Sequence, residues 1–133
     1  MDNKFHLTVV TPDRELFNED VIELYSEGSD GHFGILPNHA PMITTLIPTI
    51  TTFKDVNGKQ YTAITSDGVF KVSNNKATLL CNSAEWPEEI DKKRAEEAKQ
   101  RAEKRLKEKS LETDIKRAQF ALLRSIARLK GSN

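Results

Sequence analysis

The feature that most constrains this chain is the uneven distribution of its helix-breaking residues. All five prolines and five of the six glycines lie in residues 1–87, whereas residues 88–130 contain neither. Because glycine and proline interrupt regular helices, a stretch of this length without them indicates helix. We therefore predict two domains, a loop-rich domain at 1–87 and a helical domain at 88–133. Pro87 suits the boundary, since proline is pre-set for the first turn of a helix.

The first domain has the pattern of short β-strands. Segments rich in Val, Ile, Thr and aromatic residues occur at 5–10, 21–27, 44–53, 60–66, 69–73 and 77–83. Turn-forming residues separate them at 11–13, 28–34, 57–58, 67–68 and 74–75. Strands at this spacing predict a compact antiparallel β-sandwich or barrel. The strongest hairpin signals are Asn57-Gly58 and Asp67-Gly68, because a two-residue hairpin turn needs positive φ angles.

The second domain has the periodicity of two amphipathic helices. One apolar stripe runs through residues 88–108, at Ile90, Ala95, Ala98, Ala102 and Leu106. Another runs through residues 114–130, at Ile115, Ala118, Leu122, Ile126 and Leu129. The polar segment Ser110–Thr113 would join the helices and cap the second one. An antiparallel hairpin would bury both stripes, although one long helix is also compatible with the pattern. The alanine-rich first stripe supplies only a few kcal/mol, at about 0.8 kcal/mol per buried methyl-sized group.

The charge is balanced overall but divided between the two domains. The chain has 20 basic and 20 acidic residues, yet residues 1–87 carry a net charge of −5 and residues 88–133 carry +5. Nine acidic residues are interleaved with the fourteen basic ones in the helical domain, which also has a single aromatic residue, Phe120. We therefore expect no nucleic-acid partner, because such modules need cations clear of acids and stacking aromatic residues.

Several common site types find no support in the sequence. No phosphate-binding Gly-rich loop and no HExxH motif is present, and His6, His32 and His39 are scattered without a thiol or carboxylate ligand set. The single cysteine, Cys81, excludes an intramolecular disulfide and is predicted to be a small buried residue. No run of eighteen apolar residues occurs, and the first ten residues lack a signal-peptide pattern. We expect a cytoplasmic, non-catalytic protein with no catalytic residue and no metal site.

One loop stands out by its composition. Residues 31–41 read GHFGILPNHAP, with two glycines and two prolines around an apolar centre. Such a stiff segment could be a structural corner of the sandwich or a docking surface, since partner-binding residues favour loops on rigid scaffolds. The candidate docking loop consists of Gly31, His32, Phe33, Gly34, Ile35, Leu36, Pro37, Asn38 and His39.

This segment resembles the GDLGILPGH segment of the epsilon subunit of bacterial F-type ATP synthases. The resemblance extends to Thr11-Pro12-Asp13 and to the order of strands and helices, and it covers essentially the whole chain. It implies a sandwich of about ten strands followed by a helical hairpin. It also implies a place on the rotor's central stalk, where the sandwich contacts the gamma subunit and the membrane c-ring. The chain departs from the pattern at His32-Phe33, which weakens any carry-over of a c-ring salt bridge, and at Asn38, which tolerates positive φ.

Arginines recur on one face of each predicted helix. Asp91 and Arg94 are three residues apart, which by itself predicts an ordinary surface ion pair. Arg101 follows Arg94 after one heptad, and the second helix carries a similar stripe at Arg117, Arg124 and Arg128. If the hairpin closes, these cations repel one another unless an anion lies between them, and guanidinium groups suit phosphate oxygens.

The segment Ile90-Asp91-Lys92-Lys93-Arg94-Ala95 also resembles the I/L-D-x-x-R-A ATP-binding motif of epsilon subunits from several bacilli and related bacteria. The resemblance implies an adenine site and a phosphate site. The adenine site would comprise Glu85, Ile90, Asp91, Arg94 and Ala95, and the phosphate site Arg101, Arg124 and Arg128. ATP would then be a regulatory ligand, bound without hydrolysis and without a required metal.

The resemblance implies a rotor subunit that couples proton translocation to ATP synthesis. At low ATP the helices would extend, contact the alpha and beta subunits and inhibit hydrolysis. The subunit would be peripheral, on the cytoplasmic face of the cell membrane, with no direct insertion. The alternative is a passive coupling subunit whose helices only stabilise the stalk.

Overall fold

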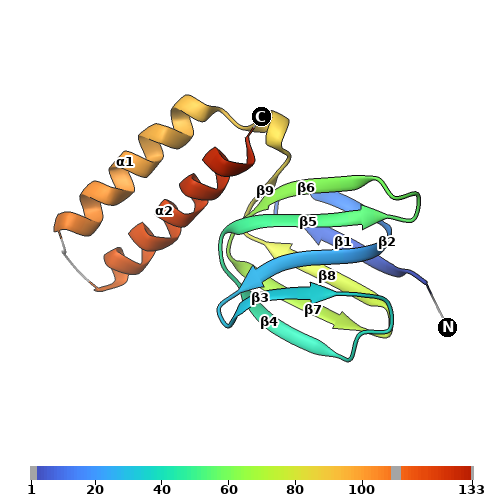
Figure 1. Ribbon diagram of the computed structural model, residues 1–133. Helices are drawn as coiled ribbons and strands as arrows, with labels where there is room; N and C mark the ends of the chain where they lie inside the picture. The colour runs from blue at the N-terminus through green and yellow to red at the C-terminus, as the bar shows by residue number, and fades with distance from the viewer. Residues whose placement is uncertain (1–2, 109–111, 133) are drawn as a thin grey trace.

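The chain folds into a β-sandwich followed by a pair of helices (Figure 1). The computed structural model describes residues 3–108 and 112–132. The strands are β1 (Phe5–Val10), β2 (Glu15–Gly28), β3 (Gly31–Ile35), β4 (Met42–Leu46), β5 (Thr49–Asp55), β6 (Gln60–Thr65), β7 (Gly68–Ser73), β8 (Lys76–Cys81) and β9 (Ala84–Glu85). The predicted fold class is confirmed, with nine strands in the described residues where about ten were expected.

The long strand β2 connects the two layers of the sandwich. Its first half runs antiparallel to β1, and its second half pairs with β5 on one edge and β3 on the other. The strand order is β1-β8-β7-β4-β2-β5-β6-β9, and β1 pairs with both β8 and β2. The β1–β8 pair is parallel, so the predicted all-antiparallel arrangement holds for the other pairs only.

Three of the predicted segments have wrong boundaries. The strand predicted at 21–27 is the second half of β2, which begins six residues earlier, at Glu15. The segment 44–53 is two strands, because β4 ends before Ile47-Pro48 and β5 begins after it. Pro48 has no N–H to donate to a neighbouring strand. The strand pairing also changes at this point, because β4 pairs with β7 whereas β5 pairs with β2 and β6. The segment 28–34 is not a turn, because Gly31–Ile35 forms β3 and only Ser29-Asp30 connect it to β2.

The hairpin signals also differ from the structure. Asn57-Gly58 does join a hairpin, β5–β6, but through a four-residue loop in which the Asp55 carboxylate accepts the N–H groups of Asn57 and Lys59. Asp67-Gly68 joins strands that do not pair with each other. The two-residue turn lies at Asn74-Asn75, which have φ angles of 51° and 58° between β7 and β8.

The core of the sandwich is built from the sandwich alone. Its fully buried side chains come from β-strands between Phe5 and Ala84, with Trp86 packed at the margin. The Trp86 ring lies 6.3 Å from Phe53 and 6.0 Å from Tyr61, measured between centroids. The sandwich therefore does not depend on the helices for its hydrophobic core.

The helical domain forms two helices, and the first of them begins later than the predicted residue 88. Pro87–Glu89 form the short 3₁₀ helix η1, after which come α1 (Lys92–Glu108) and α2 (Glu112–Gly131). The two helices lie side by side and antiparallel, so the alternative of one long helix is wrong (Figure 1). The predicted join and cap at Ser110–Thr113 falls on side chains outside the described residues. No described helix has an apolar stretch long enough to span a bilayer.

Small residues line the seam between α1 and α2. Ala95 and Ala102 are buried on α1, and Ala118 and Ser125 are buried on α2. Ser125 donates its hydroxyl to the carbonyl of Ala121, 2.9 Å away, so it adds no unsatisfied polar group. The predicted leucines and isoleucines of the stripes are only half-buried, which leaves the seam thin.

The helix α2 lies between α1 and the sandwich (Figure 1). Its last turns pack on β5 and β6, where Ala127 is buried and Gly131 faces the side chains of Ile64 and Ile50. The hairpin is therefore attached to the sandwich mainly through α2.

Gly68 provides a test of the fold. A Cβ at this position would lie 2.0 Å from the backbone oxygen of Leu80, which cannot rotate away. We expect Gly68→Ala to lower the free energy of unfolding by about 3 kcal/mol or more. Gly58→Ala is the control, because a Cβ there meets nothing within 4 Å and adds only the strain of a φ of 85°, about 1 kcal/mol. Urea denaturation of both variants would contradict the argument if Gly68→Ala were the milder change.

Candidate functional site

A cleft lies where the linker after β9, the start of α1 and the end of α2 meet. Its volume is about 510 Å³. The lining residues are Glu85, Glu89, Ile90, Asp91, Arg94, Glu97, Ala98, Arg101 and Arg128. The cleft is therefore built by both domains, and its shape depends on how the hairpin sits against the sandwich.

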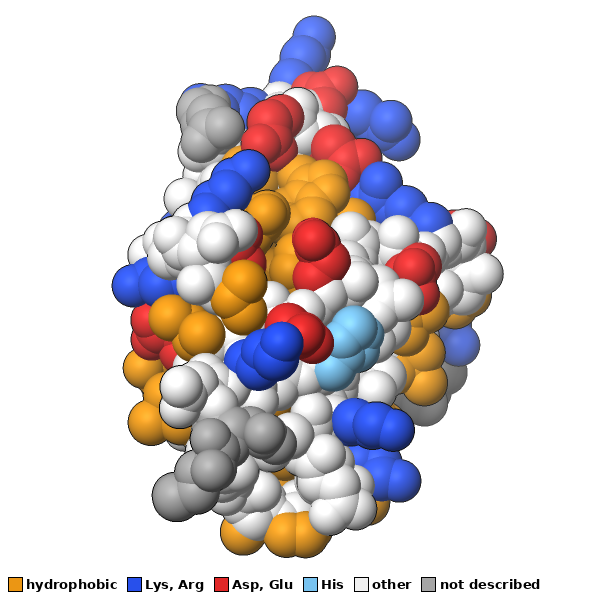
Figure 2. All heavy atoms as spheres, turned by 90° about the vertical axis from the view of Figure 1, so that its right-hand side faces the viewer, with side chains coloured by type: hydrophobic (Ala, Val, Ile, Leu, Met, Phe, Trp, Pro, Cys, Tyr) orange, Lys and Arg blue, Asp and Glu red, His pale blue; other side chains and the backbone are white. Residues whose placement is uncertain are grey.

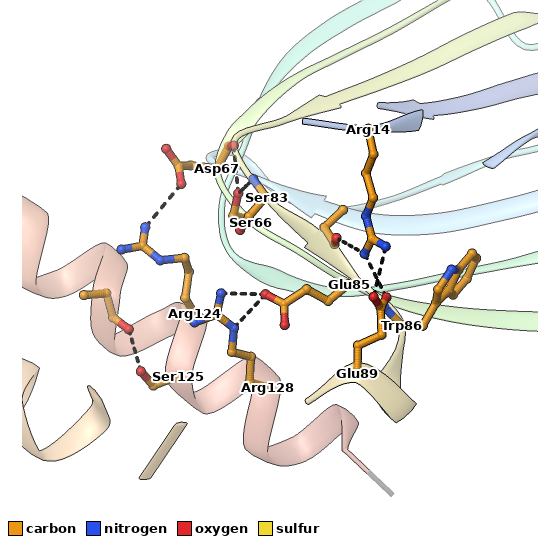
Figure 3. Close-up of polar contacts among 12 residues, drawn as sticks. Arg14, Ser66, Asp67, Ser83, Glu85, Trp86, Glu89, Arg124, Ser125 and Arg128 are labelled. Atoms are coloured by element: carbon orange, nitrogen blue, oxygen red, sulfur yellow. Dashed lines mark hydrogen bonds and ion pairs between the residues drawn. The ribbon is translucent and has the colours of Figure 1, made fainter. Parts of the chain in front are cut away.

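Glu89, which lines the cleft, is anchored to the sandwich. The Glu89 carboxylate accepts two hydrogen bonds from the Arg14 guanidinium, at 2.8 and 2.9 Å, and one from the N–H of Trp86 (Figure 3). Arg14 also donates to the carbonyl of Ala84 at 3.0 Å. These bonds lower the pKa of Glu89, first through the Arg14 hydrogen bond. The chain is thus held to the sandwich up to Glu89, and Ile90-Asp91 connect this fixed part to α1.

Asp91 caps α1. Its carboxylate accepts the backbone N–H of Arg94 at 3.1 Å, and its carbonyl accepts the N–H of Ala95 at 3.0 Å. The predicted Asp91–Arg94 ion pair is therefore replaced by an N-cap, the role that aspartate fills most readily at a helix start. Capping leaves the Arg94 guanidinium available at the mouth of the cleft.

The cleft combines paired and unpaired arginines. Arg128 of α2 donates from Nε and Nη2 to one oxygen of Glu85, at 3.0 and 2.6 Å (Figure 3). Arg94 and Arg101 are exposed on α1, and neither forms an ion pair with a carboxylate of the described residues. Four carboxylates also line the cleft, so what suits it to an anionic ligand is that the N–H donors of these two guanidinium groups are not engaged by a carboxylate.

Six of the eight predicted ATP-site residues line this cleft, and two do not. The six are Glu85, Ile90, Asp91, Arg94, Arg101 and Arg128. Ala95 is buried in the seam with α2, and Arg124 points instead toward Asp67 (Figure 3). Glu89 and Glu97 also line the cleft but were not predicted. Glu97 lies between Arg94 and Arg101 at helical spacing and could have been found from that pattern.

The predicted docking loop is half strand and half turn. Gly31–Ile35 form β3, with Phe33 packed 5.1 Å from the Phe70 ring, and the remaining residues connect β3 to β4. Asn38 adopts a φ of 67°, as expected for the residue that replaces glycine. Leu36, directly after β3, is a large apolar side chain that is 56% exposed.

Figure 2 shows the side of the molecule away from the helical hairpin. Acidic and basic side chains are interspersed there, and hydrophobic side chains form separate small groups. The face carries no field of a single sign, in keeping with the mixed charge of the sequence.

Cys81 is buried, as predicted from its position in an apolar strand. Burial, with a smaller contribution from the charge of Asp67, raises the pKa of its thiol to about 12. The thiol therefore stays protonated at neutral pH, and a protonated thiol is a poor nucleophile.

Comparisons with known families agree with this architecture. Residues 4–87 match the model of the ATP synthase delta/epsilon chain β-sandwich domain, and residues 88–132 match its long α-helix domain. The chain belongs to the ATP synthase delta/epsilon chain family. The resemblance to bacterial F-type epsilon subunits is confirmed by the ATP synthase epsilon chains of Clostridium kluyveri and Clostridium botulinum. They are 49% and 50% identical to it, over 92% and 98% of this chain and 92% and 97% of their own length.

Solved structures share the fold of this epsilon-family chain. A chain in the Euglena gracilis mitochondrial ATP synthase, solved with OSCP, F1 and the c-ring, superimposes with a TM-score of 0.79 at 22% identity. It covers 92% of this chain and 78% of its own. A chain in the central stalk and c-ring structure of the Tetrahymena thermophila mitochondrial ATP synthase has a TM-score of 0.63 at 13% identity, with 96% of both chains covered. At these identities the likeness concerns the fold.

The Arg14–Glu89 pair predicts a pH-dependent contribution to stability. Because the folded-state pKa of Glu89 is lowered, its contribution is present above the ordinary value of 4.5 and is lost as the pH falls through the folded-state pKa. We expect Glu89→Gln to lower the free energy of unfolding at pH 7 by less than about 1 kcal/mol, since the pair is largely exposed. The difference should shrink toward pH 3.

Urea denaturation followed by the fluorescence of Trp86, the single tryptophan, measures this difference. Glu88→Gln is the control, because it removes the same charge one residue away and Glu88 forms no ion pair with a described residue. A Glu89→Gln effect that is the same at pH 7 and pH 3 would contradict the assignment.

Proposed function

We propose that this chain is a non-catalytic central-stalk subunit of an F-type ATP synthase that binds ATP as a regulatory ligand in the cleft between its domains. The observation that carries this proposal is the pair of unpaired arginines, Arg94 and Arg101, in a cleft that both domains line. Guanidinium groups bind phosphate oxygens through paired N–H donors. The N-terminus of α1 adds its dipole, which also favours an anion.

Different residues of the cleft suit the phosphates and the base of a nucleotide. Arg101 and Arg128 offer cations for phosphates, whereas Ile90 and Ala98 offer apolar surface for a base. The carboxylates of the cleft can accept hydrogen bonds from a base amino group. Ala95 is buried between the helices, so it would support nucleotide binding by allowing α2 to approach α1 and not by touching the nucleotide.

Several features suit the hairpin to a conformational switch. Among the described residues, alanines and one serine line the α1–α2 seam, and no helix residue enters the core of the sandwich. A ligand at a hundred times its dissociation constant stabilises the state that binds it by about 2.7 kcal/mol. That is comparable to the burial of about three methyl groups. High ATP would therefore keep the hairpin on the sandwich, and low ATP would release it.

The partners follow from the family and from the surfaces. We assign the gamma subunit and the c-ring to the sandwich, with the segment Gly31–His39 as the docking surface toward the c-ring. Released helices, with their excess of basic residues, would meet acidic surfaces of the alpha and beta subunits and inhibit ATP hydrolysis. The subunit would be peripheral, on the cytoplasmic face of the membrane.

One observation favours the alternative of a passive coupling subunit. Arg128 pairs with Glu85 and Arg124 pairs with Asp67, so protein groups alone hold α2 against the sandwich. If these contacts suffice, the hairpin stays docked at every ATP concentration and only strengthens the stalk.

Binding of ATP by the isolated chain tests the cleft. Calorimetric titration should give one ATP per chain, and Arg94→Ala should weaken binding by about tenfold to a hundredfold. That range corresponds to a lost hydrogen bond to a charged group, worth about 1.5–3 kcal/mol. Arg105→Ala is the matched control, because Arg105 is exposed on the same helix but does not line the cleft. Equal effects of the two substitutions would contradict the assignment.

Removal of the helices tests the switch. A variant that ends at Pro87 keeps the whole core of the sandwich, so we expect it to fold and to assemble. With a reconstituted catalytic head, it should raise ATP hydrolysis relative to the full chain at low ATP and lose that difference at high ATP. Equal hydrolysis rates at all ATP concentrations would favour the passive subunit.

A further inference from the structure

Two ion pairs connect α2 to one edge of the sandwich (Figure 3). Arg128 binds Glu85, as described above, and Arg124, one helical turn earlier, lies 3.5 Å from an oxygen of Asp67. The side chains of Arg124 and Asp67 are 34% and 23% exposed, so water is partly removed from this pair. Asp67 does not line the proposed nucleotide site. It nevertheless binds Arg124, which is one of the arginines predicted to bind phosphate.

The sandwich holds Asp67 in place without help from α2. The side-chain amide of Asn82 donates to the second carboxylate oxygen of Asp67 at 2.6 Å, and the backbone N–H of Asn82 donates to its carbonyl at 2.9 Å. The adjacent Ser66 accepts the N–H of Ser83 on its hydroxyl at 2.7 Å. The carboxylate is thus a fixed anion on the sheet edge, while Arg124 has a long side chain that can turn away from it.

The Asp67 carboxylate and a phosphate group would compete for the guanidinium of Arg124. The Nη1 donor of Arg124 is directed at Asp67, and Arg124 does not line the cleft. Arg128, one helical turn away, does line it, so a guanidinium of Arg124 turned away from Asp67 would approach a ligand held there. A negative charge at Asp67 also repels a nearby phosphate. Removal of that charge therefore has two opposite consequences, since it weakens the attachment of α2 by protein groups and frees Arg124 for the ligand.

We propose that Asp67 sets the balance between ligand-independent and ligand-dependent docking of the hairpin, by holding Arg124 in competition with the phosphates of a nucleotide. The inference rests on the proposed function for the identity of the ligand. It names a residue outside the cleft that lowers the affinity for the nucleotide and, in return, holds α2 on the sandwich when nucleotide is scarce.

The test is Asp67→Asn in the full chain, with ATP and adenosine as the two probes. We expect ATP to bind roughly fivefold more tightly, as the loss of an interaction of about 1 kcal/mol would give, and adenosine to bind as before. Without nucleotide, amide exchange in the last turns of α2 should become faster by a similar factor. Asp20→Asn is the matched control, because its carboxylate pairs with Lys4 and His6 and with neither helix.

Asp67→Asn could also disturb the connection between β6 and β7, so a second variant is needed as a control for that effect. In an Arg124→Gln background, Asp67→Asn should change neither ATP affinity nor α2 exchange, because the competing partner is gone. Unchanged or weaker ATP binding by Asp67→Asn, beside normal binding by the wild type, would overturn the competition and leave the proposed function intact. Absence of ATP binding by the wild type would overturn the proposed function and the competition together. The α2 exchange rate would still decide the docking role of Asp67.

Discussion

The attachment of α2 to the edge of the sandwich is the interaction on which the position of the helices and the shape of the cleft depend. Apolar contact there is small, with Ala127 buried and Gly131 against Ile64 and Ile50. Two arginines, one turn apart, supply the polar part of the contact. Because α1 packs on α2, the same contact determines where Arg94 and Arg101 lie relative to Arg128. The cleft therefore exists only while the hairpin is docked on the sandwich, and its lining residues would separate if the hairpin undocked.

The sandwich and the hairpin are stabilised in different ways. The sandwich has a core of large side chains such as Phe53 and Phe70, closed by the long strand β2, which serves both layers. The hairpin has a seam of alanines and a charged interface. Since the free energy of burial scales with apolar area, the two parts differ in how easily they open. Opening of the hairpin leaves the core of the sandwich intact.

The parts of the fold that follow from local sequence could be predicted, and those that depend on distant partners could not. The absence of glycine and proline after Pro87 predicted the helices, and the strand segments followed from their composition. Gly68 was misread as a hairpin residue because its requirement is the nearby carbonyl of Leu80, which no local pattern reveals. The break at Pro48 was missed because apolar residues continue on both sides of it.

The same distinction applies to the cleft. Heptad spacing placed Arg94 and Arg101 on one face, and six of the eight residues singled out by the motif resemblance line one cleft. Asp91 was expected to form an ion pair, but at a helix start the unsatisfied N–H groups compete for the carboxylate, and capping prevails. Arg124 could not be placed from its own stripe, because its partner Asp67 is 57 residues away in the sequence.

The division of charge between the domains gives these contacts a common basis. The sandwich is acidic and the helical domain is basic, so folding the hairpin onto the sandwich brings opposite charges together. Screening limits this attraction to about 8–10 Å at ordinary salt concentrations, so only charges near the contact matter. Asp67 and Glu85 of the sandwich are such charges, and each is paired with an arginine of α2. Arg94 and Arg101 line the cleft without such a partner among the described residues, which is the basis of the proposed anion site.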